Sequence, residues 1–198
     1  INKINYRMKQ KVLLFHLLFI TVIGIDNALA QLQVQELAFD LDKDGITDTV
    51  WFDIDKGRLE VLLSTQANQS VHTSFLFDPL KIYSYLLIQE KQSFRLYVMK
   101  LPLITDAHFY YDEKQKRIRL SKIVIDNRNS PPGHGYKVVT TIDLLAGKFT
   151  EKRTVYQAST DEFIDEIYTG TGHFQPIYLE EYEITTAKEL LDSLIFDE

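Results

Sequence analysis

Alternating apolar and polar positions run through most of the chain beyond its first thirty residues, which is the pattern of half-buried β-strands. Polar or glycine-containing turns separate these runs, as Asp55-Lys56-Gly57 does between two of them. The expected strands are 49–54, 58–63, 93–99, 107–111, 117–126, 136–143 and 148–156. Such a pattern is typical of a sandwich, barrel or propeller. The recurrence of a polar turn followed by an apolar hairpin favours an all-β, small propeller-like array of antiparallel hairpins.

Helix is expected to be minor and to occur at two places. Ser159 and Glu162 have the spacing of a capping box, and the apolar residues that follow share one helix face, which predicts a helix near 160–168. A second helix is expected at the C-terminus, within 185–196. The segment 79–89 fits both a helix and a strand, and its tyrosines favour the strand.

The first thirty residues have the parts of a signal peptide. Residues 1–7 read as upstream sequence, Met8 as the start, and two lysines precede an apolar run of 14 residues at 12–25. Ala28-Leu29-Ala30 fits a cleavage site, so the mature protein is expected to be 31–198, a single β-rich domain. The alternative is a membrane-anchored helix, which needs roughly 20 apolar residues. We therefore expect a periplasmic or secreted protein with no stable membrane anchor after cleavage.

Composition excludes several classes of function. The leader holds four basic residues and one acidic residue, so the mature chain is more negative than the whole sequence, whose formal charge is −6. A negative surface disfavours nucleic acid and suits cations or basic protein partners. Cysteine is absent, which excludes disulfides, thiol catalysis and cysteine-bound zinc.

Four carboxylates crowd into the run 40–48, at loop positions 1, 3, 5 and 9, with Gly45 at position 6. This spacing lets a short loop wrap a calcium ion, and such close carboxylates repel one another without a cation. A solvated acidic turn is the alternative, and magnesium is disfavoured because it prefers few protein ligands. An EF-hand has glutamate at position 12, where this chain has Trp51 followed by a strand-like sequence.

The run instead resembles the calcium loops of integrin-type and FG-GAP propeller blades, in which Asp-x-Asp-x-Asp-Gly-x-x-Asp joins two strands. The resemblance implies one structural Ca²⁺. Its ligands would be the side chains of Asp40, Asp42, Asp44 and Asp48 and the carbonyl of Ile46.

Residues 117–127 and 136–148 carry a second resemblance, with Thr140-Thr141-Ile142-Asp143 and Leu145-Ala146-Gly147-Lys148 as its clearest parts. They are similar to a pattern of exported bacterial β-propeller proteins. That group includes periplasmic inhibitors that protect a cell from lysozyme-like effectors of its own secretion system. The resemblance implies an immunity protein that inhibits a lysozyme-like, peptidoglycan-cleaving enzyme. Ser121, Lys122 and Ala146 depart from the pattern.

Two expected loop tips place an aromatic residue beside a histidine: His134 with Tyr136, and His173 with Phe174. Aromatic residues are favoured in protein interfaces, so these four residues are the expected partner contacts.

We expect no enzymatic activity, because the histidines lack metal-ligand spacing and no nucleophile or phosphate-binding motif is present. The alternatives are an envelope carbohydrate-binding module or hydrolase, and a structural surface protein without a dedicated target.

Overall fold

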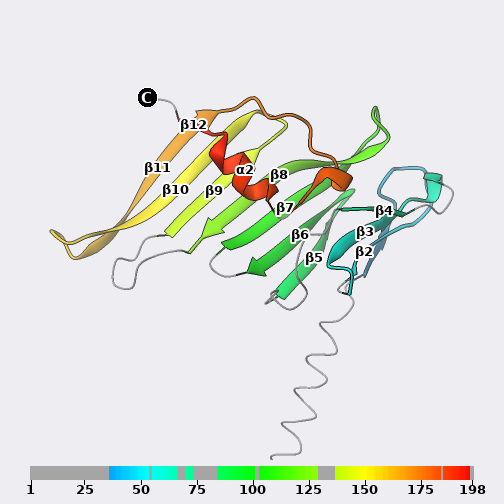
Figure 1. Ribbon diagram of the computed structural model, residues 1–198, viewed down its shortest axis with the longest axis horizontal. Helices are drawn as coiled ribbons and strands as arrows, with labels where there is room; N and C mark the ends of the chain where they lie inside the picture. The colour runs from blue at the N-terminus through cyan, green and yellow to red at the C-terminus, as the bar shows by residue number, and fades with distance from the viewer. Residues whose placement is uncertain are drawn as a thin grey trace, which may run out of the picture. The chain divides into compact units, whose positions relative to one another are not determined.

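The computed structural model describes residues 36–53, 55–66, 70–73, 84–100, 103–128, 137–183 and 185–196. The expected signal peptide and the expected loop tip with His134 and Tyr136 lie outside these residues. The described strands form two antiparallel sheets (Figure 1). The expectation of a mainly antiparallel all-β protein is confirmed.

The smaller sheet has four strands in chain order. Residues alternate along its second strand, where Val50 and Phe52 are buried while Trp51 is half-buried. Gly57 has a φ of 59° in the following turn, a left-handed conformation that glycine adopts without steric cost, so the expected Lys-Gly hairpin is confirmed. The strands are β1 (Glu36–Phe39), β2 (Asp48–Asp53), β3 (Arg58–Leu62) and β4 (Ser70–His72), and a 3₁₀ turn, η1 (Ser64–Gln66), follows β3.

The larger sheet has eight strands, and each pairs with its neighbour in the chain. The ladder between β7 and β8 contains one irregularity, at His108 and Phe109. The strands are β5 (Ser84–Glu90), β6 (Ser93–Lys100), β7 (Leu103–Asp112), β8 (Arg117–Asn127), β9 (Lys137–Asp143), β10 (Lys148–Gln157), β11 (Glu162–Thr171) and β12 (Ile195–Phe196).

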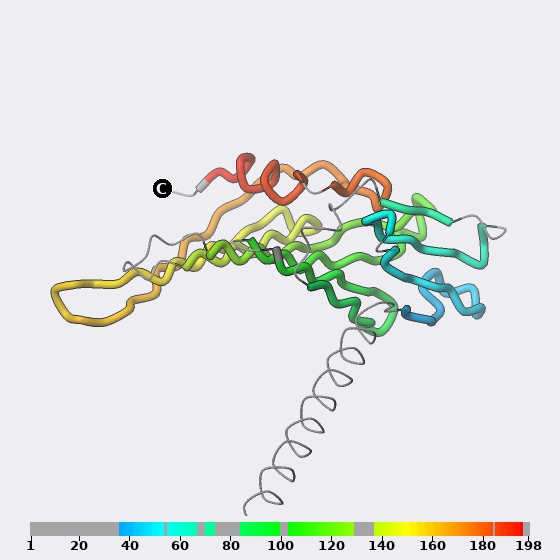
Figure 2. Tube along the Cα trace, turned by 60° about the horizontal axis from the view of Figure 1, so that its bottom comes forward, coloured from blue at the N-terminus to red at the C-terminus, as the bar shows by residue number. Residues whose placement is uncertain are grey.

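One face of the larger sheet is covered by the C-terminal part of the chain. Figure 2 shows the helix α2 (Thr186–Asp192) and the segment before it running over this face. Leu190 of α2 joins a hydrophobic cluster that also contains Phe109 of β7 and Phe52 of β2. The rings of Phe52 and Tyr85 lie 4.4 Å apart and link the two sheets. Each fully buried side chain of this size contributes about 1.5–3 kcal/mol, so this cluster holds the sheets together.

The helix expected near 160–168 is wrong, because these residues belong to the turn after β10 and to β11. Ten cross-strand pairs join β11 to β10. In a strand, successive side chains point to opposite faces, so Phe163 and Ile167 lie on one face and Ile164 and Tyr168 on the other. The apolar residues whose spacing fits one face of a helix therefore lie on both faces of the strand.

The structure agrees with the expectations for the C-terminal helix and for the described part of the segment 79–89. The C-terminal helix is confirmed for Thr186–Asp192, although the chain turns into β12 three residues later. In the ambiguous segment 79–89, the described residues 84–89 are strand, as favoured.

The propeller-like arrangement is not found among the described residues. There, β5 to β11 form one continuous meander, β12 joins its edge after α2, and no closed barrel or propeller is present. In the same part of the chain, no helix is long and apolar enough to cross a lipid bilayer.

Candidate metal centre

The acidic run forms the connection between β1 and β2, which pair from Phe39↔Asp48 onwards. It therefore joins two strands, as the resemblance implied. The backbone turns sharply here, with φ values of 66° at Lys43 and 86° at Gly45. Gly45 also donates its N–H to Asp40 Oδ2, at 3.1 Å. Its conformation thus brings the start of the loop against its middle.

Asp48 anchors the loop from within. Its side chain is almost completely buried. Oδ2 accepts the N–H groups of Leu41 at 2.8 Å and Asp42 at 3.3 Å, and Oδ1 accepts the N–H of Ser64 at 2.8 Å. Hydrogen bonds to a charged acceptor contribute about 1.5–3 kcal/mol each, so Asp48 fixes the path of the loop.

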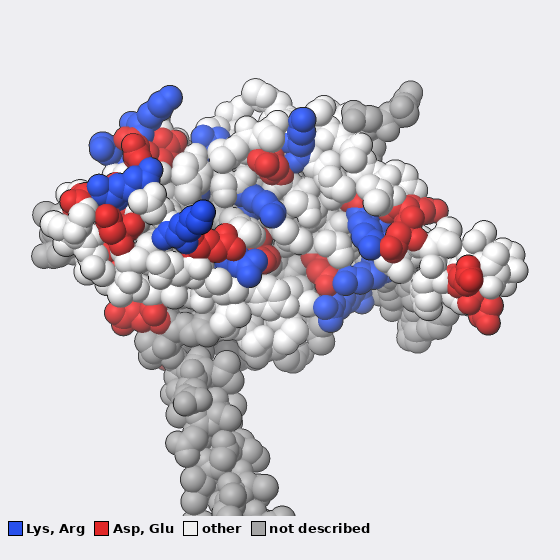
Figure 3. Space-filling model, turned by 180° about the vertical axis from the view of Figure 1, so that it is seen from behind, with Lys and Arg blue, Asp and Glu red and all other residues white. Residues whose placement is uncertain are grey.

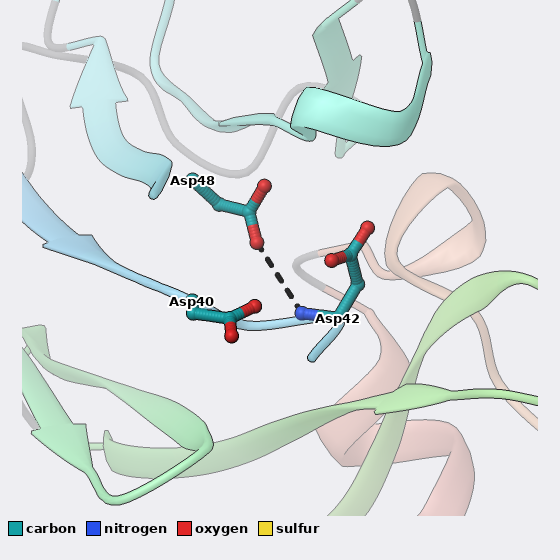
Figure 4. A group of neighbouring side chains, drawn as sticks. All are labelled: Asp40, Asp42 and Asp48. Carbon is teal, nitrogen blue, oxygen red and sulfur yellow. Dashed lines mark hydrogen bonds between the residues drawn. The ribbon is translucent and has the colours of Figure 1, made fainter. Parts of the chain in front are cut away.

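The oxygen atoms offered by Asp40, Asp42 and Asp48 all lie within 4.8 Å of one another. Figure 4 shows the three side chains gathered around the backbone N–H of Asp42. Calcium binds oxygen at about 2.3–2.6 Å, so ligands on opposite sides of one ion are up to about 5 Å apart. The separation of these oxygens therefore fits a single calcium ion.

Of the three clustered aspartates, Asp40 has the most oxygen lone pairs left for a metal ion. Its Oδ1 is buried and has no hydrogen-bond partner among the described residues. An ionised carboxylate has about four lone-pair sites, and a buried oxygen without a partner is costly. Asp42 accepts one bond at each oxygen, from the N–H of Asp44 and from the hydroxyl of Thr65. Both side chains retain lone pairs for a cation.

Asp44 and Ile46 stand apart from this group. Asp44 Oδ2 accepts the hydroxyl of Ser64 and Oδ1 accepts the N–H of Ile46, each at 2.7 Å. These two hydrogen bonds lower the pKa of Asp44 below its ordinary value. The Ile46 side chain is exposed. Three carboxylates supply fewer than the six to eight oxygens that calcium prefers, so bidentate binding, carbonyls such as that of Ile46, or water must supply the rest.

The contribution of η1 to the loop was not predictable from the sequence pattern. Ser64 and Thr65 bond to three of the four aspartates of the loop, although they lie more than fifteen residues away. Serine and threonine after a strand carry no signal for such a role. Only the pairing of β3 with β2 brings them to the loop.

Two interactions connect the loop to β7 and to the turn after it. The ammonium group of Lys43 forms an exposed ion pair with Glu113 in the β7–β8 turn, at 2.5 Å. Burial raises the pKa of Tyr111 on β7, and the charge of Asp42 adds to the rise. The loop is thus connected to the larger sheet.

The expected partner contacts His173 and Phe174 lie in the extended segment after β11. His173 is exposed, while Phe174 packs against the core. Both line a shallow cavity of about 220 Å³ together with residues of α2 such as Leu190. Of this pair, His173 is therefore the more accessible to a partner.

The chain matches no protein-family model, no curated protein and no solved structure.

Proposed function

We propose that this chain is a calcium-stabilised, non-catalytic domain that binds another protein in the periplasm or outside the cell. One observation carries the calcium part of the proposal. The buried Oδ1 of Asp40 has no partner among the described residues and lies beside the carboxylates of Asp42 and Asp48. A cation at this point satisfies the orphaned oxygen and removes the repulsion between three negative charges.

Calcium binding is tested with isothermal titration calorimetry and thermal unfolding of the chelator-treated protein. We expect one binding site. At a calcium concentration of about 100 times the dissociation constant, calcium raises the melting temperature by about 5–10 °C. Asp40→Asn should abolish both signals, because asparagine can still accept the N–H of Gly45 but carries no charge. Asp55→Asn, in the exposed β2–β3 turn, is the matched control. Equal melting temperatures in calcium and in chelator would refute the assignment.

Protein binding is supported by exposed apolar side chains on β11. Phe163 and Ile167 are 61% and 66% exposed and lie on one strand, whereas exposed apolar residues such as Ile46 and Leu145 are scattered over the described surface. Exposed apolar residues grouped on one element mark interaction sites more often than scattered ones do. The negative charge of the chain favours a basic partner.

The sharper form of the proposal is that the partner is a lysozyme-like enzyme, which this domain inhibits. It draws on the resemblance of 117–127 and 136–148 to exported inhibitors, and on charge, since lysozymes are often basic. The resemblance to propeller blades supports calcium binding by the loop 40–48 and does not extend to the arrangement of the strands. An envelope carbohydrate-binding module is the competing function.

Inhibition is measured as the rate at which a lysozyme clears a peptidoglycan suspension, with the domain added in calcium. We expect inhibition at near-stoichiometric amounts, and weaker inhibition by His173→Ala. No inhibition of any lysozyme-type enzyme encoded beside this chain would reject the sharper form. Retention of the domain on a column of immobilised glycan would favour the competing function.

A further inference from the structure

Among the described strands, none lies beside most of the outer edge of β11. β12 pairs only with Gly170 and Thr171, and no other described strand lies beside this edge. Residues 162–169 therefore present an edge of eight residues. The tip of this hairpin also extends past β9, whose pairing with β10 ends at Thr154 (Figure 1).

Backbone geometry shows which residues direct hydrogen-bonding groups to this edge. The N–H of Gly172 bonds to the carbonyl of Gly147 at 2.9 Å, one step beyond the pair Lys148↔Thr171. Bonded and non-bonded pairs alternate in an antiparallel ladder. The bonded residues of β11 are therefore the even-numbered ones. The backbone N–H and C=O groups of Phe163, Asp165, Ile167 and Thr169 point away from β10, towards the free edge.

The side chains of the edge are apolar and acidic. Phe163 and Ile167 are the most exposed apolar residues of β11, and Ile164 and Tyr168 are each 36% exposed. The charged residues are all acidic, namely Glu162, Asp165 and Glu166, and β11 contains no lysine or arginine. Figure 3 shows acidic side chains and no basic ones at the far end of the hairpin.

Charge distinguishes between the possible occupants of the edge. Pairing with β11 of a second copy brings three carboxylates of one strand beside three of the other, and like charges on neighbouring strands are destabilising. A strand with lysine or arginine gains instead from contacts with Glu162 and Glu166, whereas Asp165 already forms an ion pair with Lys152 of β10. Acidic residues thus protect the edge from self-association while leaving it open to a basic strand. The chain's own β12 already adds to the same edge at Gly170 and Thr171.

We propose that the free edge of β11, residues 162–169, binds a partner protein by strand addition, and that the added strand alternates basic residues with β-branched apolar ones. This inference rests on the proposed protein-binding function and names its surface and the chemistry of its partner. Backbone hydrogen bonds from Phe163, Asp165, Ile167 and Thr169 hold the added strand, and the acidic side chains select its charge.

The probe is a synthetic nonapeptide in which lysine alternates with valine, labelled with a fluorophore and titrated with the full domain in calcium. Two matched peptides serve as controls: one N-methylated at alternate residues, which removes the N–H donors, and one with glutamate in place of lysine. We expect both controls to bind about tenfold more weakly or worse, because the first loses several backbone hydrogen bonds and the second places like charges beside the acidic edge.

A pair of variants tests the edge itself. Ile167→Pro removes an N–H that points away from β10, so the hairpin keeps its own ladder and proline is tolerated as on other edge strands. Ile167→Thr keeps the N–H and the β-branched shape. We expect proline to weaken peptide binding about tenfold, and threonine less than about threefold.

Several outcomes overturn the proposal. These are no measurable binding of the lysine–valine peptide, equal binding of the N-methylated peptide, or equal binding by Ile167→Pro. A dimer in analytical ultracentrifugation that Ile167→Pro dissociates assigns the edge to a second copy. Lysozyme inhibition by Ile167→Pro equal to that of the parent rejects this surface but not the proposed function. Peptide binding without any inhibition rejects the lysozyme partner but not the edge.

Discussion

Replacing Gly45 and Gly147 by alanine, one at a time, separates backbone strain from steric exclusion. Both glycines have left-handed backbone angles, with φ of 86° and 64°. A Cβ added to Gly45 meets nothing within 4 Å, whereas one added to Gly147 lies 2.9 Å from the carbonyl oxygen of Gly172. The two sites thus share the same kind of backbone conformation and differ in the space around it.

The expected loss in the free energy of unfolding follows from the backbone angles and from the space around each glycine. A left-handed conformation costs alanine about 1–2 kcal/mol, and the stiffer unfolded chain offsets about 0.4–1 kcal/mol of this. Gly45→Ala should therefore lower the free energy of unfolding by about 1 kcal/mol. Gly147→Ala carries the same strain plus a contact with a backbone oxygen that cannot rotate away. Because Gly172 also bonds to Gly147 in the ladder, we expect a loss of about 2–4 kcal/mol.

The assay is urea unfolding followed by circular dichroism, in chelator and in calcium. Gly45→Asn is the control, because asparagine tolerates left-handed angles better than alanine does and should cost least. Gly45→Ala should also weaken calcium binding, because alanine disfavours the left-handed conformation that directs the backbone N–H of residue 45 to Asp40. Equal losses at the two glycines, or no loss at Gly45, would show that the strain argument is wrong.

Three further predictions concern the core, a surface ion pair and alkaline pH. Leu120→Ala should destabilise the fold by about 2–5 kcal/mol in urea unfolding, because Leu120 is fully buried and its removal leaves a cavity; a loss below 1 kcal/mol would contradict this. Lys43→Ala should leave the free energy of unfolding nearly unchanged despite the short Lys43–Glu113 distance, because both side chains are exposed and solvent screens the pair; a clear coupling in a double-mutant cycle would show a stronger link. Burial raises the pKa of Tyr182 far above its ordinary value near 10, so the stability from its neutral form is present below pH 10 and is lost as pH rises beyond it. Tyr182→Phe should therefore flatten the fall in melting temperature above pH 10, and an unchanged slope would count against a buried, neutral Tyr182.

Strands were predictable where one face is buried. In β8, for example, Ile123 and Ile125 are buried and Val124 between them is half-buried, which is the alternation read from the sequence. β11 lacks this constraint, because both of its faces near the hairpin tip are exposed. Its apolar residues follow no period-2 pattern, and pairing with β10 decides the structure instead. The two-residue β12 is too short to leave a signal.

Part of the candidate site was predictable, because its acidic residues are close in the sequence. Asp40, Asp42 and Asp48 come together within one loop, as their spacing indicated. Asp44 has the same spacing but is held by Ser64, a residue that only the β2–β3 pairing brings near. The free edge of β11 could not be foreseen, because the sequence expectation there was a helix.

The meander order of the larger sheet has a consequence for how the chain folds. Every strand from β6 to β11 pairs with the strand directly before it in the chain, so no long loop has to close before hydrogen bonds form. Folding can advance hairpin by hairpin, each new strand using the edge of the previous one as its template. A chain released gradually from its N-terminus can complete the sheet as far as β10 before β11 has emerged.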